Sequence, residues 1–347
     1  MELSRATTNK TCMAYVLLLL GLIISGLDIS GAQSVGVCYG LNGAGLPAAS
    51  EVVELYKRNG ITRMRIYDPN PATLNALRGS NIELIVDVFK AKLQGLTNDA
   101  AAANWVQTNL RAYSPDVKFR YIAVGNEVRP GDPEAKFVLP AMKSIQNAVS
   151  SANLGDQIKV STAIDTTLLG DSSPPSDGVF SAAASPYITP IVKFLAEKGA
   201  PLLANVYPYF SYTESRGVID LGYALFTSPK VVVIDKNGKG YKNLFDAQVD
   251  SLYSALEKAG APGLKVVVSE SGWPSEGDQA ATTDNARTYY RNLIGHVKGG
   301  TPKRPQGPIE TYLFAMFDEN KKDGAAVEKH FGLFFPNKQP KYQLSFS

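Results

Sequence analysis

The chain has 347 residues, of which 44% are hydrophobic and 19% charged, and its formal net charge is +3. These values are typical of a globular protein and exclude a disordered chain, and the small net charge without a basic cluster argues against nucleic acid as a partner. The length suits a single α/β barrel, which often exceeds about 250 residues.

The N-terminus has the pattern of a secretory signal peptide. Arg5 and Lys10 give it a positive start, an apolar run follows over residues 13–27, and small residues occupy positions 30–32. A retained membrane anchor is the alternative, but the apolar run is shorter than the roughly 20 residues that span a bilayer. We therefore predict cleavage near Gln33 and a mature protein without a membrane segment.

The rest of the chain alternates between short apolar segments rich in β-branched residues and amphipathic helical stretches. With residues 1–32 assigned to the signal peptide, eight such strand segments are spread over residues 33–347, so we predict one α/β domain, a single (β/α)8 TIM barrel. The predicted strands are Val35–Gly40, Arg63–Asp68, Glu83–Val88, Phe119–Glu127, Lys159–Asp165, Leu202–Tyr209, Leu264–Glu270 and Ile309–Asp318. The predicted helices begin with one between Pro47 and Asn59 and continue with Asp99–Leu110, Leu139–Ser150, Pro190–Lys198, Lys242–Ala259 and Asp284–Val297.

An elaborated loop region is predicted after the sixth strand. The apolar run Val231–Ile234 is followed by Asn237-Gly238, a dipeptide that favours a tight hairpin turn. We expect this region to build up one wall above the barrel.

Cysteine and histidine are too sparse for several kinds of site. Cys38 is the only cysteine of the predicted mature chain, and its apolar surroundings indicate a buried side chain rather than a nucleophile. The only histidines are His296 and His330, and the sequence contains no zinc-binding motif and no glycine-rich nucleotide loop. We therefore predict no metal and no organic cofactor.

Two glutamates lie at the ends of predicted strands. Glu127 follows the fourth and Glu270 ends the seventh, and barrel active sites lie at the carboxyl ends of the strands. Cleavage of a glycosidic bond needs two carboxyl groups, one to protonate the leaving oxygen and one to attack the anomeric carbon or activate water. A structural salt bridge is the alternative for each glutamate, and their spacing in the sequence does not show that they face each other.

Six sequence blocks, in order along the predicted mature chain, carry a family resemblance. The most specific of them contains Ser269-Glu270-Ser271-Gly272-Trp273-Pro274. The blocks span residues 35–40, 65–69, 121–127, 205–210, 267–275 and 314–322. Together they resemble the plant β-1,3-glucanases, members of glycoside hydrolase family 17.

The resemblance implies a retaining mechanism through a covalent glycosyl-enzyme. By position, Glu270 matches the nucleophile, Glu127 matches the proton donor and base, and Asn126 would hydrogen-bond the sugar 2-hydroxyl. It also implies a charged group near the pair, in which a lysine among carboxylates favours the charged form of Glu270 while Glu127 holds its proton. The members of this group are Glu319, Lys322 and Glu328.

Aromatic residues are predicted to line the substrate cleft, because aromatic faces suit the C–H faces of glucose. They are Tyr67, Tyr207, Phe210, Trp273 and Phe317. Tyr67 and Tyr207 are the first choices because they lie at predicted strand ends, whereas Trp273 and Phe317 could equally belong to the core.

Asp318 departs from the family pattern, in which asparagine is usual. An extra acid beside Glu319 is expected to shift the pH optimum without abolishing activity, because neither predicted catalytic glutamate is changed.

The resemblance implies endo-hydrolysis of β-1,3-glucans such as callose, fungal wall glucan and laminarin, in plant defence or wall remodelling. Two alternatives stay open: a hydrolase of mixed-linkage β-1,3;1,4-glucan, and a non-catalytic glucan-binding protein. Vacuolar members usually carry a C-terminal propeptide, whereas this sequence stops soon after the last block, so secretion to the extracellular cell-wall space is expected. A monomer is expected of a hydrolase that must reach a bulky polymer.

Overall fold

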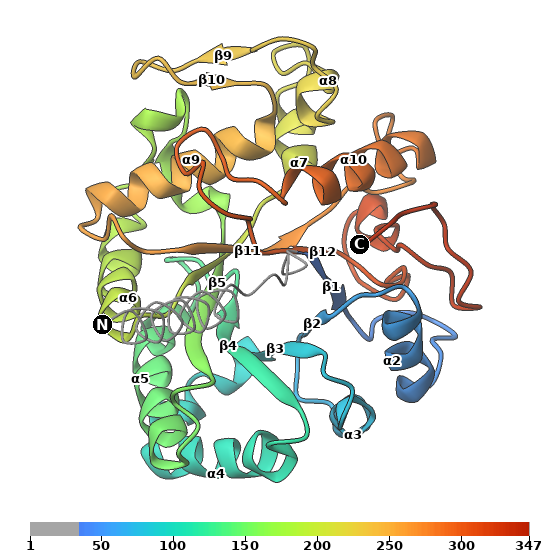
Figure 1. Cartoon of the computed structure of the whole chain (residues 1–347). Helices are drawn as coiled ribbons and strands as arrows, with labels where there is room; N and C mark the ends of the chain where they lie inside the picture. Colours follow the sequence, from blue (N-terminus) through green and yellow to red (C-terminus); the bar gives the residue numbers. More distant parts are fainter. Residues whose placement is uncertain (1–34, 347) are drawn as a thin grey trace, which may run out of the picture. The chain divides into compact units, whose positions relative to one another are not determined.

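The computed structural model describes residues 35–346, so the predicted signal peptide lies outside the described residues. Residues 35–346 form a closed barrel of eight parallel strands with helices around it (Figure 1). The strand order around the ring is β1-β12-β11-β8-β5-β4-β3-β2, and β1 pairs with both β2 and β12. The predicted barrel is therefore confirmed. Its strands are β1 (Val35–Tyr39), β2 (Arg63–Ile66), β3 (Glu83–Val88), β4 (Lys118–Asn126), β5 (Lys159–Asp165), β8 (Leu202–Asn205), β11 (Val266–Ser271) and β12 (Thr311–Leu313).

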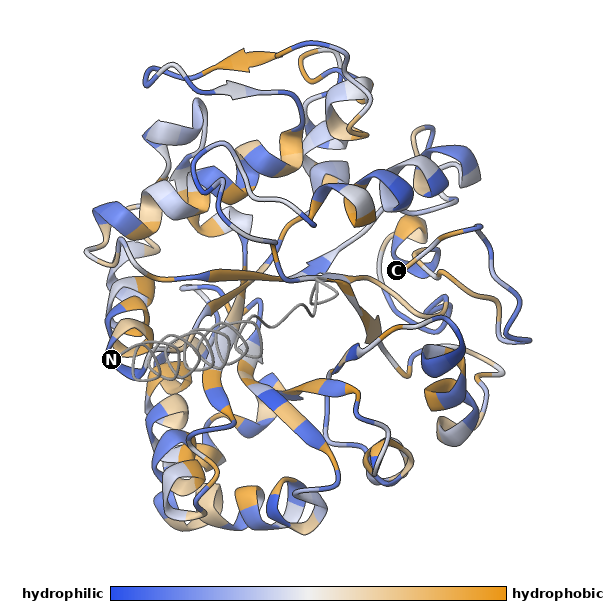
Figure 2. Cartoon of the chain, in the orientation of Figure 1, coloured by the Kyte–Doolittle hydropathy of each residue, from blue (hydrophilic) through white to orange (hydrophobic). Residues whose placement is uncertain are grey.

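The helices pack apolar faces against the strands, and apolar and hydrophilic residues alternate along them (Figure 2). In the first helix after β1, for example, Val52, Val53 and Tyr56 are buried, and the Tyr56 hydroxyl donates to the Val37 carbonyl oxygen at 3.0 Å. Within residues 35–346, no helix combines the length and the apolar character that crossing a bilayer requires. The helices are α2 (Ala49–Arg58), α3 (Pro71–Leu77), α4 (Asp99–Asn109), α5 (Ala135–Ser151), α6 (Ser185–Lys198), α7 (Pro208–Glu214), α8 (Leu221–Ala224), α9 (Leu244–Lys258) and α10 (Thr283–His296).

Several elements differ from the prediction. The sixth barrel strand ends at Asn205, because Pro208 starts α7, as proline often does at the first position of a helix. Helix α6 begins at Ser185, so Pro190 lies inside it rather than at its start. The sequence analysis missed α3, although Asn70 caps it by accepting a hydrogen bond from the Thr73 amide at 3.0 Å.

The predicted elaboration after the sixth strand is present. It contains α7, α8 and a two-stranded hairpin of β9 (Val233–Ile234) and β10 (Gly240–Tyr241). The hairpin lies against the segment that carries another short strand pair, β6 (Leu169–Asp171) with β7 (Val179–Phe180), and the Ser176 amide donates to Asp235 at 2.9 Å. The start of this region reaches the centre of the barrel mouth, where Tyr207 and Phe210 pack against the central cluster.

The barrel interior is packed rather than open. Inward-facing side chains, including Ile85, Leu203 and Val267, form a buried cluster. Cys38 belongs to it, and its thiol donates to the Ser269 carbonyl oxygen at 3.4 Å, which confirms the predicted buried position. Access to the barrel centre is therefore from the carboxyl ends of the strands.

Candidate active site

A cavity of about 530 Å³ lies at the carboxyl ends of the barrel strands. Loops from distant parts of the sequence build it, so folding is needed to bring its parts together. Among its lining residues are Tyr67, Asn126, Glu127, Glu270, Glu319 and Lys322.

Glu127 occupies a constrained backbone position directly after β4. Its φ is +51°, a left-handed conformation that is uncommon for residues other than glycine. The Glu127 amide donates to the Ala163 carbonyl oxygen at 2.9 Å, and the Thr162 hydroxyl donates to the Gly125 carbonyl oxygen at 3.1 Å. Neighbouring β5 therefore fixes the strand end from which the Glu127 side chain enters the cavity.

The environment of the Glu127 carboxyl group favours its protonated form. Burial and then the nearby negative charge of Glu270 raise the pKa of Glu127 to about 7. The Asn205 amide donates to Glu127 Oε1 at 2.9 Å and only partly offsets these two effects. Glu127 is thus a carboxyl group that can carry a proton near neutral pH.

Glu270, on β11, is buried and surrounded by hydrogen-bond donors. The Tyr67 hydroxyl donates to Oε1 and the Tyr207 hydroxyl to Oε2, both at 2.7 Å. Arg65 adds an ion pair at 2.9 Å. A carboxylate accepts hydrogen bonds only, so these three donors match its charged form and fix its orientation.

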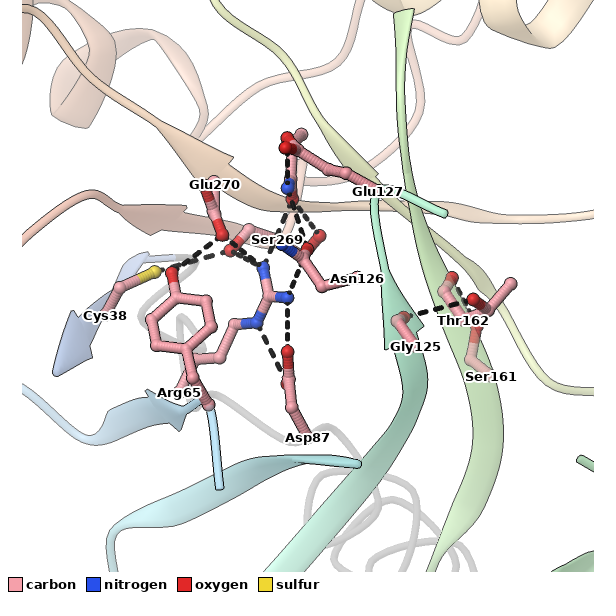
Figure 3. Close-up of polar contacts among 12 residues, drawn as sticks. Cys38, Arg65, Asp87, Gly125, Asn126, Glu127, Ser161, Thr162, Ser269 and Glu270 are labelled. Carbon is pink, nitrogen blue, oxygen red and sulfur yellow. Dashed lines mark hydrogen bonds and ion pairs between the residues drawn. The ribbon is translucent and has the colours of Figure 1, made fainter. Parts of the chain in front are cut away.

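Arg65 is the centre of the polar network (Figure 3). It lies fully buried on β2 and forms two hydrogen bonds with Asp87, at 3.1 and 2.7 Å. The same guanidinium group donates to Glu270, to Asn126 Oδ1 at 2.8 Å and to Asn205 Oδ1 at 3.1 Å. Arg65 therefore links the strand that carries Glu270 to the strand end that carries Asn126.

The predicted charged group after β12 is assembled beside the catalytic pair. Lys322 donates to Glu328 at 2.9 Å and lines the same cavity as Glu270. The cation in direct contact with Glu270 is Arg65, which the sequence analysis did not predict. The Glu319 carboxyl group is buried against Gly40, where any side chain would collide with it. Burial raises the pKa of Glu319, although the Lys322 charge opposes this effect.

The aromatic predictions divide into two groups. Tyr67 and Tyr207 hold Glu270, and Phe210 packs on the Tyr207 ring with 5.3 Å between ring centroids. Trp273 and Phe317 are 0% and 2% exposed, so their assignment to the cleft is corrected: both belong to the core. The Trp273 indole nitrogen donates to a backbone carbonyl at 2.9 Å, which satisfies its polar atom in the interior.

Asp318 also lies elsewhere than expected. Lys341 donates to both of its carboxylate oxygens at 2.9 Å, and the Gly332 amide donates to Oδ1 at 2.8 Å. Asp318 therefore connects the loop after β12 to the C-terminal segment, instead of adding an acid to the cavity.

The sequence analysis missed Arg65, Asp87 and Asn205. Each is a polar barrel-strand residue whose neighbours in the sequence are apolar, and alternation along a barrel strand can place such residues inside. The inward position of these three residues could therefore be inferred from the sequence, but their contacts with one another could not. Within residues 35–346, no group of three or more His, Cys, Asp or Glu side chains is arranged to hold a metal ion.

A parallel (β/α)8 barrel with two acidic side chains at its strand ends is an arrangement of glycoside hydrolases. Comparison with known proteins agrees with this class. Residues 35–346 match the family described as Glycosyl hydrolases family 17, and the chain belongs to that family.

The similarity to relatives is close and nearly full-length. A glucan endo-1,3-beta-glucosidase of Vitis vinifera is 63% identical over 336 residues, which cover 96% of this chain and 97% of the relative. An acidic isoform of the same enzyme from Nicotiana tabacum is 53% identical, with coverage of 96% and 97%.

Two solved structures support the fold and the family. A beta-1,3-glucanase and pollen allergen of Cryptomeria japonica is 48% identical, with a TM-score of 0.87 and coverage of 90% of this chain and 99% of that one. One of two plant beta-glucan endohydrolases described as having distinct substrate specificities is also 48% identical, with a TM-score of 0.86 and coverage of 89% and 99%.

Proposed function

We propose that this protein hydrolyses internal β-1,3 linkages of β-glucans by a retaining double displacement, with Glu270 as nucleophile and Glu127 as acid and base. The contrast between the two carboxyl environments carries the proposal. Glu270 accepts hydrogen bonds from three donors, one of them a guanidinium group. Burial and the Glu270 charge raise the pKa of Glu127 to about 7. The first environment suits a nucleophile and the second a proton donor.

In the first half of the reaction, protonated Glu127 gives its proton to the glycosidic oxygen while the Glu270 carboxylate attacks the anomeric carbon. The bond to the leaving oxygen breaks, a bond to Glu270 forms, and the leaving chain departs with a free hydroxyl group. Arg65, Tyr67 and Tyr207 hold Glu270, which fixes the direction of attack.

In the second half, Glu127 is ionised and acts as a base. It takes a proton from a water molecule, whose oxygen attacks the anomeric carbon and displaces Glu270. Two inversions at this carbon leave the product in the β configuration of the substrate. General acid–base catalysis by one side chain contributes about 10²- to 10⁴-fold to such a reaction.

Asn126 is oriented to bind the sugar 2-hydroxyl. Its side-chain oxygen accepts hydrogen bonds from Arg65 at 2.8 Å and from Asn205 at 3.0 Å. Its amide N–H group is therefore the part left to donate to substrate, in a contact that strengthens in the transition state. We assign Glu319, Lys322 and Glu328 to the charged wall beside this position, with Tyr67 as a further substrate contact and Phe210 as support for Tyr207.

The relatives support β-1,3-glucan as the substrate. The relatives from Vitis vinifera and Nicotiana tabacum are named glucan endo-1,3-beta-glucosidases, and the match spans nearly the whole of each. A mixed-linkage β-1,3;1,4-glucan is the competing substrate, because one similar structure comes from a pair of plant endohydrolases with distinct substrate specificities.

The substrate test uses residues 33–347, a linear β-1,3-glucan and a mixed-linkage β-glucan in parallel. Reducing ends and product sizes are followed over time. Release of a mixture of short oligomers from the β-1,3-glucan supports the proposal. Preference for the mixed-linkage polymer would change the substrate, and binding without release from either polymer would contradict catalysis.

We further propose that the protein is secreted to the cell-wall space as a monomer. The support is the N-terminal pattern of positive start, apolar run and small residues. Other relatives include a basic vacuolar isoform of Nicotiana tabacum, so location needs its own test. Plant cells that express the full chain should release a protein whose N-terminus lies near Gln33, and recovery of the uncut chain in membranes would contradict secretion.

A further inference from the structure

The β9–β10 hairpin carries the positive charge excess of the chain. Residues 230–242, called here the lysine hairpin, contain four lysines and one acidic residue, which gives them a formal net charge of +3. The whole chain also has a net charge of +3, so positive and negative residues balance over the rest of it. A charge excess confined to one short segment favours a partner of opposite charge at that segment. The four lysines are Lys230, Lys236, Lys239 and Lys242.

The inner face of the lysine hairpin is fixed to the body of the protein. Val233 and Tyr241 are paired across the two strands, and Val233 packs against the main hydrophobic core. Tyr241 is buried, and its hydroxyl donates to Asp250 on α9 at 3.0 Å. Because side chains alternate between the two faces of a strand, the residues next to Val233 and Tyr241 point away from the protein.

The outer face combines apolar side chains with a lysine. Val232 and Ile234 are 44% and 76% exposed. Gly240 is paired with Ile234, so no side chain covers Ile234 from across the hairpin. Lys242 follows the inward-facing Tyr241 and is exposed. The outer face therefore presents an apolar ridge beside a positive charge.

Most of the lysine charges are open to a ligand. Lys236 pairs with Asp177, whereas Lys230, Lys239 and Lys242 form no ion pair with any of residues 35–346. The hairpin lies at the outer edge of the molecule, beyond α9 (Figure 1), and β9 is apolar there (Figure 2). No residue of the lysine hairpin lines the cavity that contains Glu127 and Glu270. A ligand on the hairpin would therefore leave the cavity open.

We propose that the lysine hairpin binds a linear acidic polysaccharide, a polymer whose sugar units carry carboxylate groups. The ammonium groups pair with the carboxylates, and Val232 and Ile234 contact the C–H faces of the sugar rings. Lys230 and Lys236 are six positions apart, which is at most about 22 Å, so one polymer chain can meet lysines at both ends of the hairpin. This binding goes beyond the hydrolysis of a neutral glucan, and it anchors the protein in an acidic matrix.

The charges and the side chains favour this ligand over two others. A symmetric contact with a second copy of the chain would place lysines against lysines, which repel each other. Segments that bind the surface of a lipid bilayer usually insert tryptophan, phenylalanine or leucine, and the outer face of the strands offers only Val232 and Ile234 as large apolar side chains.

The test measures calorimetric binding of residues 33–347 to polygalacturonate and to the same polymer with its carboxylates methyl-esterified. The wild type should bind polygalacturonate with an affinity that falls as salt is added, and should bind the esterified polymer at least about tenfold more weakly. The double variant Lys230→Gln/Lys242→Gln should bind polygalacturonate about threefold to thirtyfold more weakly than the wild type.

The matched control is Lys143→Gln/Lys193→Gln, which removes the same charge from exposed positions on α5 and α6. It should keep the wild-type affinity within about twofold. Both double variants should keep the wild-type rate on a soluble β-1,3-glucan, because neither changes the cavity.

Three results would overturn the proposal. They are equal binding of the two polymers, an equal loss of affinity in the two double variants, and binding to vesicles that contain phosphatidylglycerol without binding to polygalacturonate. The binding measurement does not depend on catalysis. A wild type that hydrolyses no glucan would contradict the proposed function, and the affinities for the two polymers would still decide whether the lysine hairpin is a binding site.

Discussion

Replacing Glu127 with glutamine is expected to stabilise the folded protein in a pH-dependent way. Burial and the charge of Glu270 raise the pKa of Glu127 from its ordinary 4.5 to about 7. The folded chain therefore binds more protons than the unfolded chain between these two pH values, and the wild type loses stability as pH rises through this interval. Glutamine has nearly the same shape, carries no charge, and keeps an oxygen that can accept from Asn205.

The size of the effect follows from the difference between the two pKa values. Each pKa unit corresponds to 1.36 kcal/mol, so ionised Glu127 costs the folded state up to about 3 kcal/mol above pH 7. Below pH 4.5 the carboxyl group is protonated in both states and this cost disappears. The free energy of unfolding of Glu127→Gln should thus exceed that of the wild type by up to about 3 kcal/mol at pH 8, and by much less at pH 4.

Urea unfolding at a series of pH values measures this difference, because titrations of all other groups largely cancel between the two proteins. Glu197→Gln is the control, since Glu197 is an exposed glutamate on α6, and its free energy of unfolding should stay within about 0.5 kcal/mol of the wild type. The same Glu127→Gln protein should lose about 10²- to 10⁴-fold in kcat. A stability difference that does not change between pH 4 and pH 8 would refute the buried, proton-holding role of Glu127.

Three further substitutions test other parts of the site. Glu270→Ala should keep the fold and lose at least about 10³-fold in kcat. Added azide should restore activity with inverted product configuration, and a retained configuration would contradict the nucleophile assignment. Asp318→Asn should leave the pH–rate profile unchanged. It should lower the free energy of unfolding by about 1–3 kcal/mol, because Lys341 loses its charged partner. A shifted pH optimum would show that Asp318 acts on the cavity. Gly40→Ala would place a methyl group 1.7 Å from the Glu319 carboxylate. We expect kcat/KM to fall about tenfold to a hundredfold while the circular dichroism spectrum is preserved. An unchanged kcat/KM would show that Glu319 can move without consequence.

The barrel and the two glutamates could be predicted because their signals are local. Apolar strand segments and amphipathic helices repeat along the sequence, and Glu127 and Glu270 come at the ends of two such strands. The carboxyl ends of parallel barrel strands meet at one mouth, so strand position alone indicates where a side chain must go.

The partners of the two glutamates could not be predicted, because their contacts join residues far apart in the sequence. Arg65 and Glu270 are separated by 205 positions, and Asn205 and Glu127 by 78. Lys322 is nearer to Glu270 in sequence than Arg65, yet its amine donates to Glu328. Strand periodicity indicates that Arg65 points inward, but not which carboxylate it meets.

Trp273 and Asp318 show a second limit. Both lie in sequence blocks around the site, and both side chains turn away from the cavity. Trp273 packs among buried tyrosines, with a ring centroid 5.1 Å from that of Tyr209, and Asp318 pairs with Lys341 from the C-terminal segment. Membership of a motif therefore predicted the neighbourhood of these residues correctly, but not the direction of their side chains.

The most direct test of the central claim is the configuration of the first product released from a β-1,3-gluco-oligosaccharide. Proton NMR can record the anomeric signal of the new reducing end before mutarotation mixes the two forms. A retaining enzyme with Glu270 as nucleophile and Glu127 as acid and base should release the β-anomer first. Initial release of the α-anomer would contradict the double displacement.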